Sequence, residues 1–382
     1  MKIFYWCPFI GNVATINAVL NSIKSINRYS NNFMKTYLIN SVGEWDSKKE
    51  TIDKNKIQII NFYNSNLINY LPKLGFIKSR FTYFVIFFLS VFKLHKILKR
   101  KKPEFLIIHL ITFVPLFLMI LFKYETKFIL RISGYPKLNM MRKIFWKLAA
   151  SRITYVTTPT ISTLKLIKSS KIFPEDKVIY LPDPVLNINE IQKKRNENEI
   201  LENQLSKKNS LVSIGRLTKQ KNFEFLIDAF NDIQNKYNNL NLFIIGEGEQ
   251  KQKLIKRIDD LKLTQKVFLI GYKNNIYNYL KNSKMFVLTS LWEDPGFVLL
   301  EAGYSNKLVM SSDCPNGPAE ILGDGKNGFL FKSNSKKDFI EKFDEIMNCN
   351  DSIVDKKKVL LKKKCKEFTI LNHYKKLIKI LN

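Results

Sequence analysis

The feature that most constrains the fold of this chain is a repeated alternation of short apolar runs and helical segments. In the C-terminal half, apolar runs cover residues 211–214, 242–245, 267–270 and 285–288, and the first three are each closed by a glycine. A segment with helical periodicity follows the first run at residues 223–230. Short apolar runs bounded by turn residues are typical of buried strands. Strands that alternate with helices predict an α/β fold with a parallel sheet.

The chain is long enough for two such sheets. Its 382 residues exceed what one core normally supports, and a hydrophobic content of 45% suffices for two. Strands of the first sheet are predicted at residues 3–6, 37–39, 57–60, 105–110, 127–133, 153–157 and 178–181. We expect an N-terminal domain at 1–185, a hinge at 182–184, a C-terminal domain at 186–365 and a final helix within 366–382. Residues 187–209 are polar and predict a linker or an exposed helix.

The final segment and one N-terminal loop complete these expectations. The last helix is predicted to bury one face, which consists of Leu371, Tyr374, Leu377, Ile378 and Leu381. Gly11 and Asn12 are predicted to open the helix that follows the first strand, where a ligand loop and a plain tight turn are both compatible with the sequence.

Residues 290–301 (SLWEDPGFVLLE) place Glu293 and Glu301 on either side of a Pro-Gly turn. An apolar strand precedes this stretch and an apolar helix begins near Phe297, so residues 294–296 form the strand-to-helix loop. Such loops bind ligands in open α/β sheets, and a helix N-terminus there attracts phosphate. The alternative is two solvated carboxylates with a fortuitous spacing.

Four motifs in order resemble the family 4 retaining glycosyltransferases, which have the GT-B fold. The motifs are the two glutamates with seven residues between them, residues 211–216 followed by Lys221 and Asn222, residues 243–248, and residues 316–330. The resemblance covers residues 211–331. It implies an α/β protein of two facing Rossmann-like domains with parallel sheets, and a C-terminal crossover helix that packs back on the N-terminal domain. It also implies a nucleotide-sugar donor, which we expect to be a UDP-sugar, and retention of the anomeric configuration.

The resemblance also implies roles for individual residues. Glu301 would accept hydrogen bonds from the ribose hydroxyls, and Glu293, with the backbone of Gly296 and Phe297, would hold hydroxyls of the transferred sugar. The donor site is predicted to comprise Gly11, Gly215, Arg216, Lys221, Gly296, Phe297, Val298 and Glu301. Glu293, Arg216 and Lys221 are the predicted catalytic residues.

Departure of a nucleoside diphosphate requires positive charge near two phosphates. The sequence has no Asp-x-Asp motif and no histidine cluster, so no metal and no other cofactor is expected. Arg216 and Lys221 come from one loop at a strand end and would supply this charge together with the helix N-terminus. Surface cations are the alternative interpretation of both residues.

The wall for sugar and acceptor is predicted in the N-terminal domain. Ser133 stands where the resembling family often has an active-site histidine, so Arg131, Ser133 and the backbone of Gly134 are the candidates there. His109 ends the preceding strand and is a further candidate, although a lone histidine at a strand end is more often structural.

The charge of the chain predicts an anionic partner for the N-terminal domain. The formal net charge is +30, and residues 54–174 contain 22 basic but only 2 acidic residues. Residues 81–92 are largely apolar and lie between basic residues, which predicts a helix in the membrane interface; a core helix with a basic end is the alternative. Compositional drift of the genome is the alternative for the total charge. An anionic membrane surface and a lipid-linked or glycan acceptor are the predicted partners.

Cysteine usage and the N-terminus predict a location. The four cysteines show no paired spacing, which is typical of a reducing compartment, and no signal-peptide pattern precedes the first strand. We therefore expect a cytoplasmic protein that is peripheral on the inner face of the cytoplasmic membrane.

Two other functions remain compatible with the sequence. A non-catalytic nucleic-acid-binding protein would account for the basic charge, but no DNA- or RNA-binding motif is present, so no nucleic acid is expected. A phosphorylase that uses free phosphate would share the fold. Both differ from a transferase in their response to nucleotide sugars.

Overall fold

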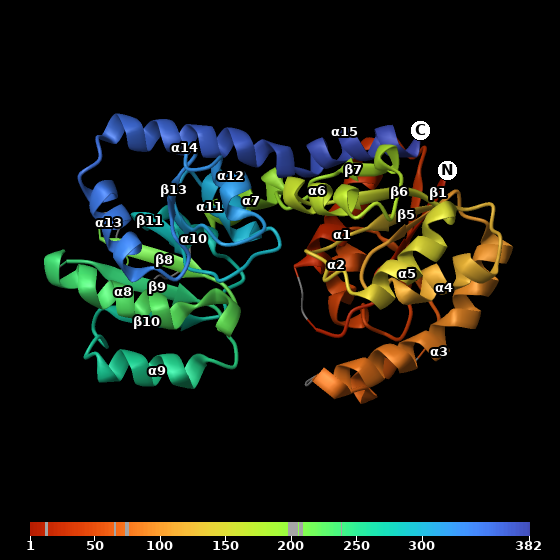
Figure 1. The fold of residues 1–382 in the computed structure, drawn as a ribbon, viewed down its shortest axis with the longest axis horizontal. Helices are drawn as coiled ribbons and strands as arrows, with labels where there is room; N and C mark the ends of the chain where they lie inside the picture. Colours follow the sequence, from red (N-terminus) through yellow and green to blue (C-terminus); the bar gives the residue numbers. More distant parts are fainter. Residues whose placement is uncertain (12–13, 65, 73–75, 198–204, 206–208, 238) are drawn as a thin grey trace. The chain divides into compact units, whose positions relative to one another are not determined.

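The computed structural model describes all residues except 12–13, 65, 73–75, 198–204, 206–208 and 238, and for residues 76–79 it describes the backbone only. The chain divides into two compact units (Figure 1). The first unit comprises residues 1–184 and 370–382, and the second comprises residues 185–369. The first stretch of the first unit ends at residue 184, one residue before the predicted end at 185. Its second stretch begins at residue 370, four residues after the predicted start at 366.

The first unit contains a parallel sheet whose seven described strands have the order β3-β2-β1-β4-β5-β6-β7. The strands are β1 (Lys2–Trp6), β2 (Lys35–Asn40), β3 (Gln58–Asn61), β4 (Phe105–Ile108), β5 (Lys127–Arg131), β6 (Ile153–Thr158) and β7 (Val178–Tyr180). Its helices are α1 (Thr15–Tyr29), α2 (Lys49–Lys54), α3 (Phe76–Lys101), α4 (Phe113–Leu121), α5 (Met140–Ala149), α6 (Ile161–Ser169) and α15 (Ile370–Leu381). Every predicted strand of this sheet is therefore present.

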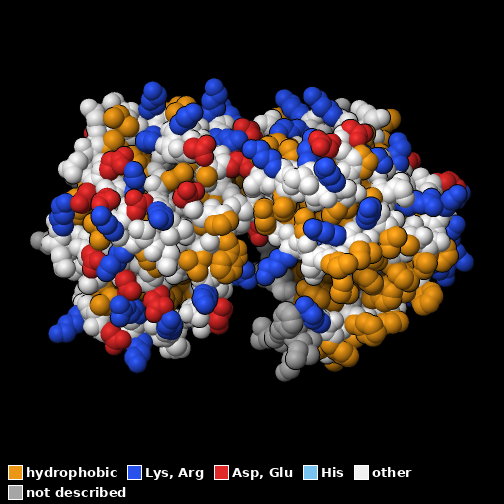
Figure 2. Space-filling view, in the orientation of Figure 1, with side chains coloured by type: hydrophobic (Ala, Val, Ile, Leu, Met, Phe, Trp, Pro, Cys, Tyr) orange, Lys and Arg blue, Asp and Glu red, His pale blue; other side chains and the backbone are white. Residues whose placement is uncertain are grey.

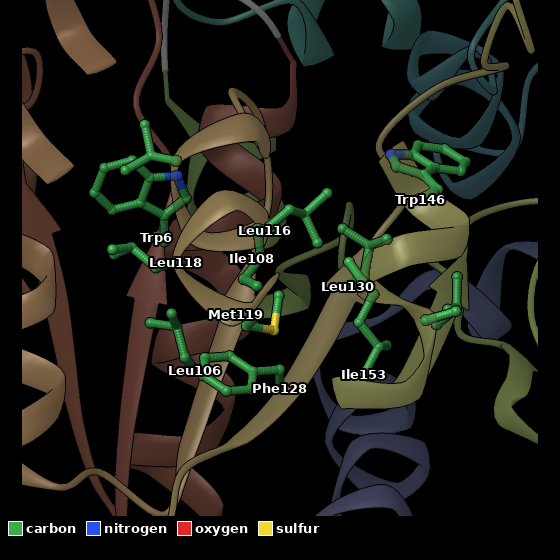
Figure 3. Packing of buried hydrophobic residues seen from close by; sticks show 14 of the residues in the cluster. Trp6, Leu106, Ile108, Leu116, Leu118, Met119, Phe128, Leu130, Trp146 and Ile153 are labelled. Atoms are coloured by element: carbon green, nitrogen blue, oxygen red, sulfur yellow. The ribbon is translucent and has the colours of Figure 1, made fainter. Parts of the chain in front are cut away.

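Alternate residues of these strands face two separate apolar layers. In β4, Leu106 and Ile108 point into a layer that α4 and α5 cover, and Figure 3 shows them beside Met119 and Phe128. Phe105 and Ile107 belong to the other layer, where α1 and α15 pack. A parallel strand buried on both faces is apolar at nearly every position, which explains the long apolar runs in the sequence.

The second unit repeats this plan with described strands in the order β10-β9-β8-β11-β12-β13. The strands are β8 (Ser210–Ile214), β9 (Asn241–Ile245), β10 (Val267–Gly271), β11 (Met285–Leu288), β12 (Leu308–Ser312) and β13 (Phe329–Phe331). The helices are α7 (Ile188–Asn196), α8 (Phe223–Lys236), α9 (Lys251–Asp260), α10 (Tyr277–Lys281), α11 (Phe297–Tyr304), α12 (Pro318–Leu322), α13 (Lys336–Met347) and α14 (Asp351–Cys365). The α/β class and the two parallel sheets are therefore confirmed.

Three local predictions differ from the structure or lie outside it. Leu371 is exposed, because the buried face of α15 is formed by Ile370, His373, Leu377, Ile380 and Leu381. The first part of the segment predicted as a linker or an exposed helix is helix α7, which differs from a fully exposed helix in that it buries Ile191 in the second unit and contacts α10. Most of residues 198–208 and Asn12, where the first helix was predicted to open, lie outside the described residues.

Candidate functional site

The candidate site lies where the strand order of the second sheet reverses. Strands β8 and β11 are neighbours there although β9 and β10 separate them in sequence. The loops that follow both strands leave the same edge of the sheet, because parallel strands place their carboxyl ends together. Ligands of open α/β sheets bind at such a reversal.

Hydrogen bonds tie these loops into one layer. Leu291 N donates to Gln220 O, the Thr289 hydroxyl donates to Lys221 O, and Glu293 N donates to Pro315 O in the loop after β12. Three loops from three strands are thus fixed relative to one another by the backbone.

Lys221 and Glu293 form an ion pair across this reversal. Lys221 Nζ donates to Glu293 Oε1 at 2.5 Å, and the Ser290 hydroxyl donates to the same oxygen at 2.5 Å. The Glu293 carboxylate is 5% exposed and the Lys221 side chain is 14% exposed. A buried carboxylate requires such partners, since an unpaired charge in the interior is costly. The structure thus brings together two of the three predicted catalytic residues.

Glycines allow the strand-end loops to approach each other closely. Gly246 has φ +151°, and a Cβ atom on it would lie 1.9 Å from Gly215 O. Gly317 has φ +143°, and a Cβ atom on it would lie 2.0 Å from Pro295 O. Any side chain at Gly246 or Gly317 would push these loops apart, so both positions require glycine.

Helix α11 begins at the centre of this layer. Its N-terminal cap is Gly296, with φ +92° and no capping side chain, so free N–H groups remain at the helix start. The other end of α11 is held by α14, because Gly303 leaves space for Leu361 and Cys365. An uncapped helix N-terminus attracts anions such as phosphate.

Glu301 differs from Glu293 because its carboxylate has no hydrogen-bond or ion-pair partner among the residues that the structure describes. Burial raises the pKa of Glu301 to about 7, and the positive charge of Lys194 opposes this shift. The pKa of the buried Tyr277 hydroxyl is raised by burial and by the charge of Glu301. An unpartnered carboxylate of this kind can accept hydrogen bonds from ligand hydroxyl groups.

The other predicted donor residues differ in how far their side chains are exposed to solvent. Arg216 is exposed, and no hydrogen bond or ion pair of its side chain is found in the described part of the chain. Phe297 is half-buried, whereas Val298 is 8% exposed and its side chain belongs to the apolar core. Only the backbone of Val298 is therefore positioned for a ligand. Gly215 lies beside the Lys221 side chain, since a Cβ atom there would approach Lys221 Cε to 3.0 Å.

Two of the four predicted wall residues, His109 and Arg131, line a small internal cavity of about 10 Å³ in the first unit. Arg131 is 3% exposed and donates to Leu181 O and to Asp183 Oδ1, each at 2.6 Å. Its guanidinium group is thus committed to the segment that leads out of the first unit. This position differs from the predicted open wall, because Asp183 provides the counter-charge that a buried arginine needs.

His109, Ser133 and Gly134 remain candidates with defined surroundings. His109 is buried, its Nδ1 atom has no partner among the described residues, and burial lowers its pKa well below the usual value, with smaller effects from Arg131 and His373. The Ser133 hydroxyl is buried and also without a partner there, and Gly134 is half-buried.

Gly11 lines a separate cleft of about 310 Å³ in the first unit, which the sequence analysis did not predict. Glu44 lies in this cleft and accepts hydrogen bonds from Ser41 N at 3.0 Å and Val42 N at 2.8 Å. Burial raises the pKa of Glu44 to about 7, although these hydrogen bonds lower it. The available sequence signal was the pair Gly43-Glu44, three residues after the end of β2.

Three further residues that support the site were not predicted from the sequence. Ser290 holds Glu293, and Lys194 lies in the stretch predicted as a linker. Cys314 is buried near the ion pair, and burial raises the pKa of its thiol to about 12, with a smaller contribution from Glu293. Only Ser290 had a local signal, its position three residues before Glu293.

Within the described ranges, no group of three or more histidine, cysteine, aspartate or glutamate residues is arranged to hold a metal ion. Arg216, Lys221 and the start of α11 place positive charge at the candidate site.

Known proteins resemble this chain in sequence. The family described as "Glycosyl transferases group 1" matches residues 194–367. An uncharacterised glycosyltransferase of Methanocaldococcus jannaschii is 33% identical over 293 residues, which cover 72% of this chain and 68% of that protein. A Campylobacter jejuni enzyme, N-acetylgalactosamine-N,N'-diacetylbacillosaminyl-diphospho-undecaprenol 4-alpha-N-acetylgalactosaminyltransferase, is 33% identical over 131 residues, or 34% of this chain and 35% of the enzyme.

A solved structure resembles the whole chain. This is the crystal structure of HepE from Anabaena in complex with UDP and glucose. Its TM-score is 0.72 and its sequence identity is 14%, and the match covers 100% of this chain and 99% of that one. At this identity the likeness shows the fold alone. Together with the two parallel Rossmann-like sheets, it shows that the fold is GT-B.

Proposed function

The chain belongs to the glycosyl transferases group 1 family, and from this premise we propose that it transfers a hexose or an N-acetylhexosamine from a UDP-sugar to a lipid-linked or surface-polysaccharide acceptor. The name of the Campylobacter relative includes a diphospho-undecaprenol acceptor, which supports a lipid-linked substrate. The HepE complex contains UDP and glucose, which supports the donor class. We further propose retention of the anomeric configuration and no requirement for a metal ion.

The observation that carries the proposal is the Lys221–Glu293 ion pair beside the uncapped start of α11. When the bond between the sugar and the diphosphate breaks, the bonding electrons pass to the leaving phosphate oxygen. Lys221, Arg216 and the N–H groups of α11 would stabilise this negative charge. Arg216 can bind two phosphate oxygens at once, whereas Lys221 adds a single charge.

The two glutamates would have different tasks. Glu301 would accept hydrogen bonds from the ribose hydroxyls, and its lack of a partner among the residues that the structure describes supports this role. Glu293 is already bound to Lys221 and Ser290 through one oxygen, so we propose that it positions Lys221 while its other oxygen meets the sugar. A carboxylate held in this way supports an anchoring role better than a nucleophilic one. The acceptor hydroxyl would attack on the face that UDP leaves and give its proton to the departing phosphate.

The acceptor would meet the enzyme at a membrane. We propose that the protein is cytoplasmic and peripheral on the inner face of the cytoplasmic membrane, because the first unit is strongly basic. A lipid-diphosphate acceptor would be attracted to the same surface.

The proposal is tested by a donor screen with purified protein. UDP-, GDP-, ADP- and dTDP-sugars are offered in EDTA, and slow donor hydrolysis and thermal shift are followed for the wild type, Glu301→Ala and Arg216→Ala. Lys219→Ala is the matched control, because Lys219 is an exposed cation of the same loop. We expect a response to UDP-sugars in the wild type and the control that both site variants lose.

Other results would contradict specific parts of the proposal. A response that survives both site substitutions would show that Glu301 and Arg216 do not form the donor site. Activity only with added divalent metal would remove metal independence. Release of a sugar phosphate with inorganic phosphate as the acceptor would identify a phosphorylase.

A further inference from the structure

Helix α3 has two different faces. Thr82, Ile86, Leu94 and Leu98 are at most 2% exposed and form a stripe that packs against the first unit. On the remaining surface of the helix, Phe81, Phe84, Phe88 and Phe92 are 54–78% exposed. Four large aromatic side chains on one water-facing surface are unfavourable without a partner.

Two further helices extend this apolar surface. Ring contacts run from Phe84 to Phe88 at 4.6 Å, from Phe88 to Phe87 at 5.2 Å, from Phe87 to Phe113 at 5.2 Å and from Phe113 to Phe145 at 4.7 Å. These contacts connect α3, α4 and α5 without interruption. Figure 2 shows hydrophobic side chains gathered over these three helices. We call this surface the α3–α5 face; its exposed members are Phe81, Phe84, Phe88, Phe92, Phe113, Leu121, Met140, Met141, Ile144 and Leu148.

The same helices carry basic side chains and no acidic ones. Residues 76–101, 113–121 and 140–149 contain no aspartate or glutamate. Six exposed basic residues on or beside these helices have no ion-pair partner in the described part of the chain: Lys96, Arg100, Lys101, Lys123, Lys143 and Lys147. Nearby, Glu125 is paired with Lys102. The α3–α5 face is therefore both apolar and cationic.

This combination selects among possible partners. A second copy of the chain would bring the same positive charges and be repelled. Nucleic acid would neutralise the charge but leave ten large apolar side chains in water. An anionic bilayer satisfies both properties, because its phosphate groups attract lysine and arginine while its acyl boundary accepts phenylalanine and methionine.

A transmembrane orientation of α3 conflicts with its packing. By length and composition, the segment Arg80–Lys101 could cross a bilayer. However, Leu94 and Leu98 of its buried stripe belong to the apolar core of the first unit. A helix that spanned the bilayer would lose these contacts. A helix buried on one side and apolar on the other fits a position in the plane of the interface.

We propose that the α3–α5 face inserts into the headgroup and upper acyl region of an anionic bilayer. Phenylalanine rings of α3 and α4 and the methionine pair of α5 would enter the apolar boundary, while the basic residues would contact lipid phosphates. This inference names the surface through which the proposed transferase would contact the membrane, and the purpose of that contact rests on the proposed function. The binding itself requires neither a donor nor an acceptor.

The test is flotation of the full-length protein with vesicles of phosphatidylcholine alone or with 40% phosphatidylglycerol. Phe88→Glu/Met141→Glu changes the apolar part of the face, and Lys143→Glu/Lys147→Glu changes its charge. Phe33→Glu is the matched control, because Phe33 is a phenylalanine outside the face with 73% exposure. All altered side chains are exposed, and thermal shift verifies that each variant is folded.

We expect the wild type and the Phe33 control to float with anionic vesicles, and each double variant to bind at least about tenfold more weakly. Added salt should weaken wild-type binding. The inference is overturned if wild-type protein stays with the soluble fraction, if both double variants bind normally, or if sedimentation shows a dimer that the Phe88/Met141 variant abolishes. The UDP-induced thermal shift, measured without vesicles, reports separately on the proposed function and should be unchanged in all variants.

Discussion

Replacement of Glu301 by glutamine should stabilise the free protein in a manner that depends on pH. Burial raises the pKa of this carboxyl from 4.5 to about 7, so the folded state prefers its neutral form. In the unfolded chain the group ionises near its ordinary pKa. As the pH rises from 4.5 to 7, the unfolded state loses its proton first, and the stability of the wild type therefore falls.

The size of this effect follows from the shift. A shift of about 2.5 pKa units corresponds to about 3 kcal/mol once the pH exceeds 8. For a unit of this size, this is roughly 6–12 °C in the melting temperature. Glutamine keeps a polar amide in the same place and never ionises, so Glu301→Gln should lack the penalty.

The assay is the melting temperature of wild type and Glu301→Gln between pH 4.5 and 8.5, with Glu341→Gln as a control at an exposed glutamate of the same unit. The variant and the wild type should melt alike at pH 4.5 and diverge progressively to pH 8, where the variant melts higher. The control should follow the wild type throughout. The affinity for UDP should be higher in the wild type than in Glu301→Gln, because the ionised carboxylate is the better acceptor for ribose hydroxyls. A difference that does not change with pH, or a variant that melts lower at pH 8, would refute the reasoning.

Three further substitutions test ion pairs and close backbone contacts within the individual units. Lys221→Met leaves the Glu293 carboxylate buried without its counter-charge, and should cost about 3–5 kcal/mol and abolish the UDP-induced thermal shift; an unchanged melting temperature would show that the pair is dispensable. Gly246→Ala places a Cβ atom 1.9 Å from a carbonyl oxygen, and should cost more than about 2 kcal/mol in urea unfolding; a neutral effect would mean that the loops can separate freely. Arg131→Met unpairs Asp183 and should destabilise the first unit by about 3–5 kcal/mol, with partial recovery in the double variant Arg131→Met/Asp183→Asn; additive losses would argue against coupling.

Much of the fold could be predicted from sequence because each central strand is buried on both faces and is continuously apolar. The approach of Lys221 to the loop of Glu293 was also predictable, since both follow strands at the reversal of the sheet order. The partner of Arg131 was not predictable, because Asp183 lies 52 residues away and nothing local indicates the pair. The orientation of Val298 depends on the rotation of α11, which an apolar helix does not reveal.

The surface of the first unit shows a second limit of sequence patterns. Helix α3 is apolar nearly all round between its basic ends, so its periodicity could not separate a buried stripe from an exposed one. The structure separates them through the neighbours of each side chain. Met140, Met141, Ile144 and Leu148 carried no signal of a shared surface with α3, since residues 102–139 lie between α3 and α5 and only packing brings these side chains together.

The two site glutamates differ in a way that separates a structural role from a ligand-binding one. Glu293 has a cation and a hydroxyl as partners, as a buried carboxylate must have to be stable in the folded protein. Glu301, eight residues later, has neither in the described part of the chain, and burial favours its neutral form over its ionised form in the folded protein. We therefore propose that a ligand supplies the hydrogen bonds that the Glu301 carboxylate lacks among the described residues.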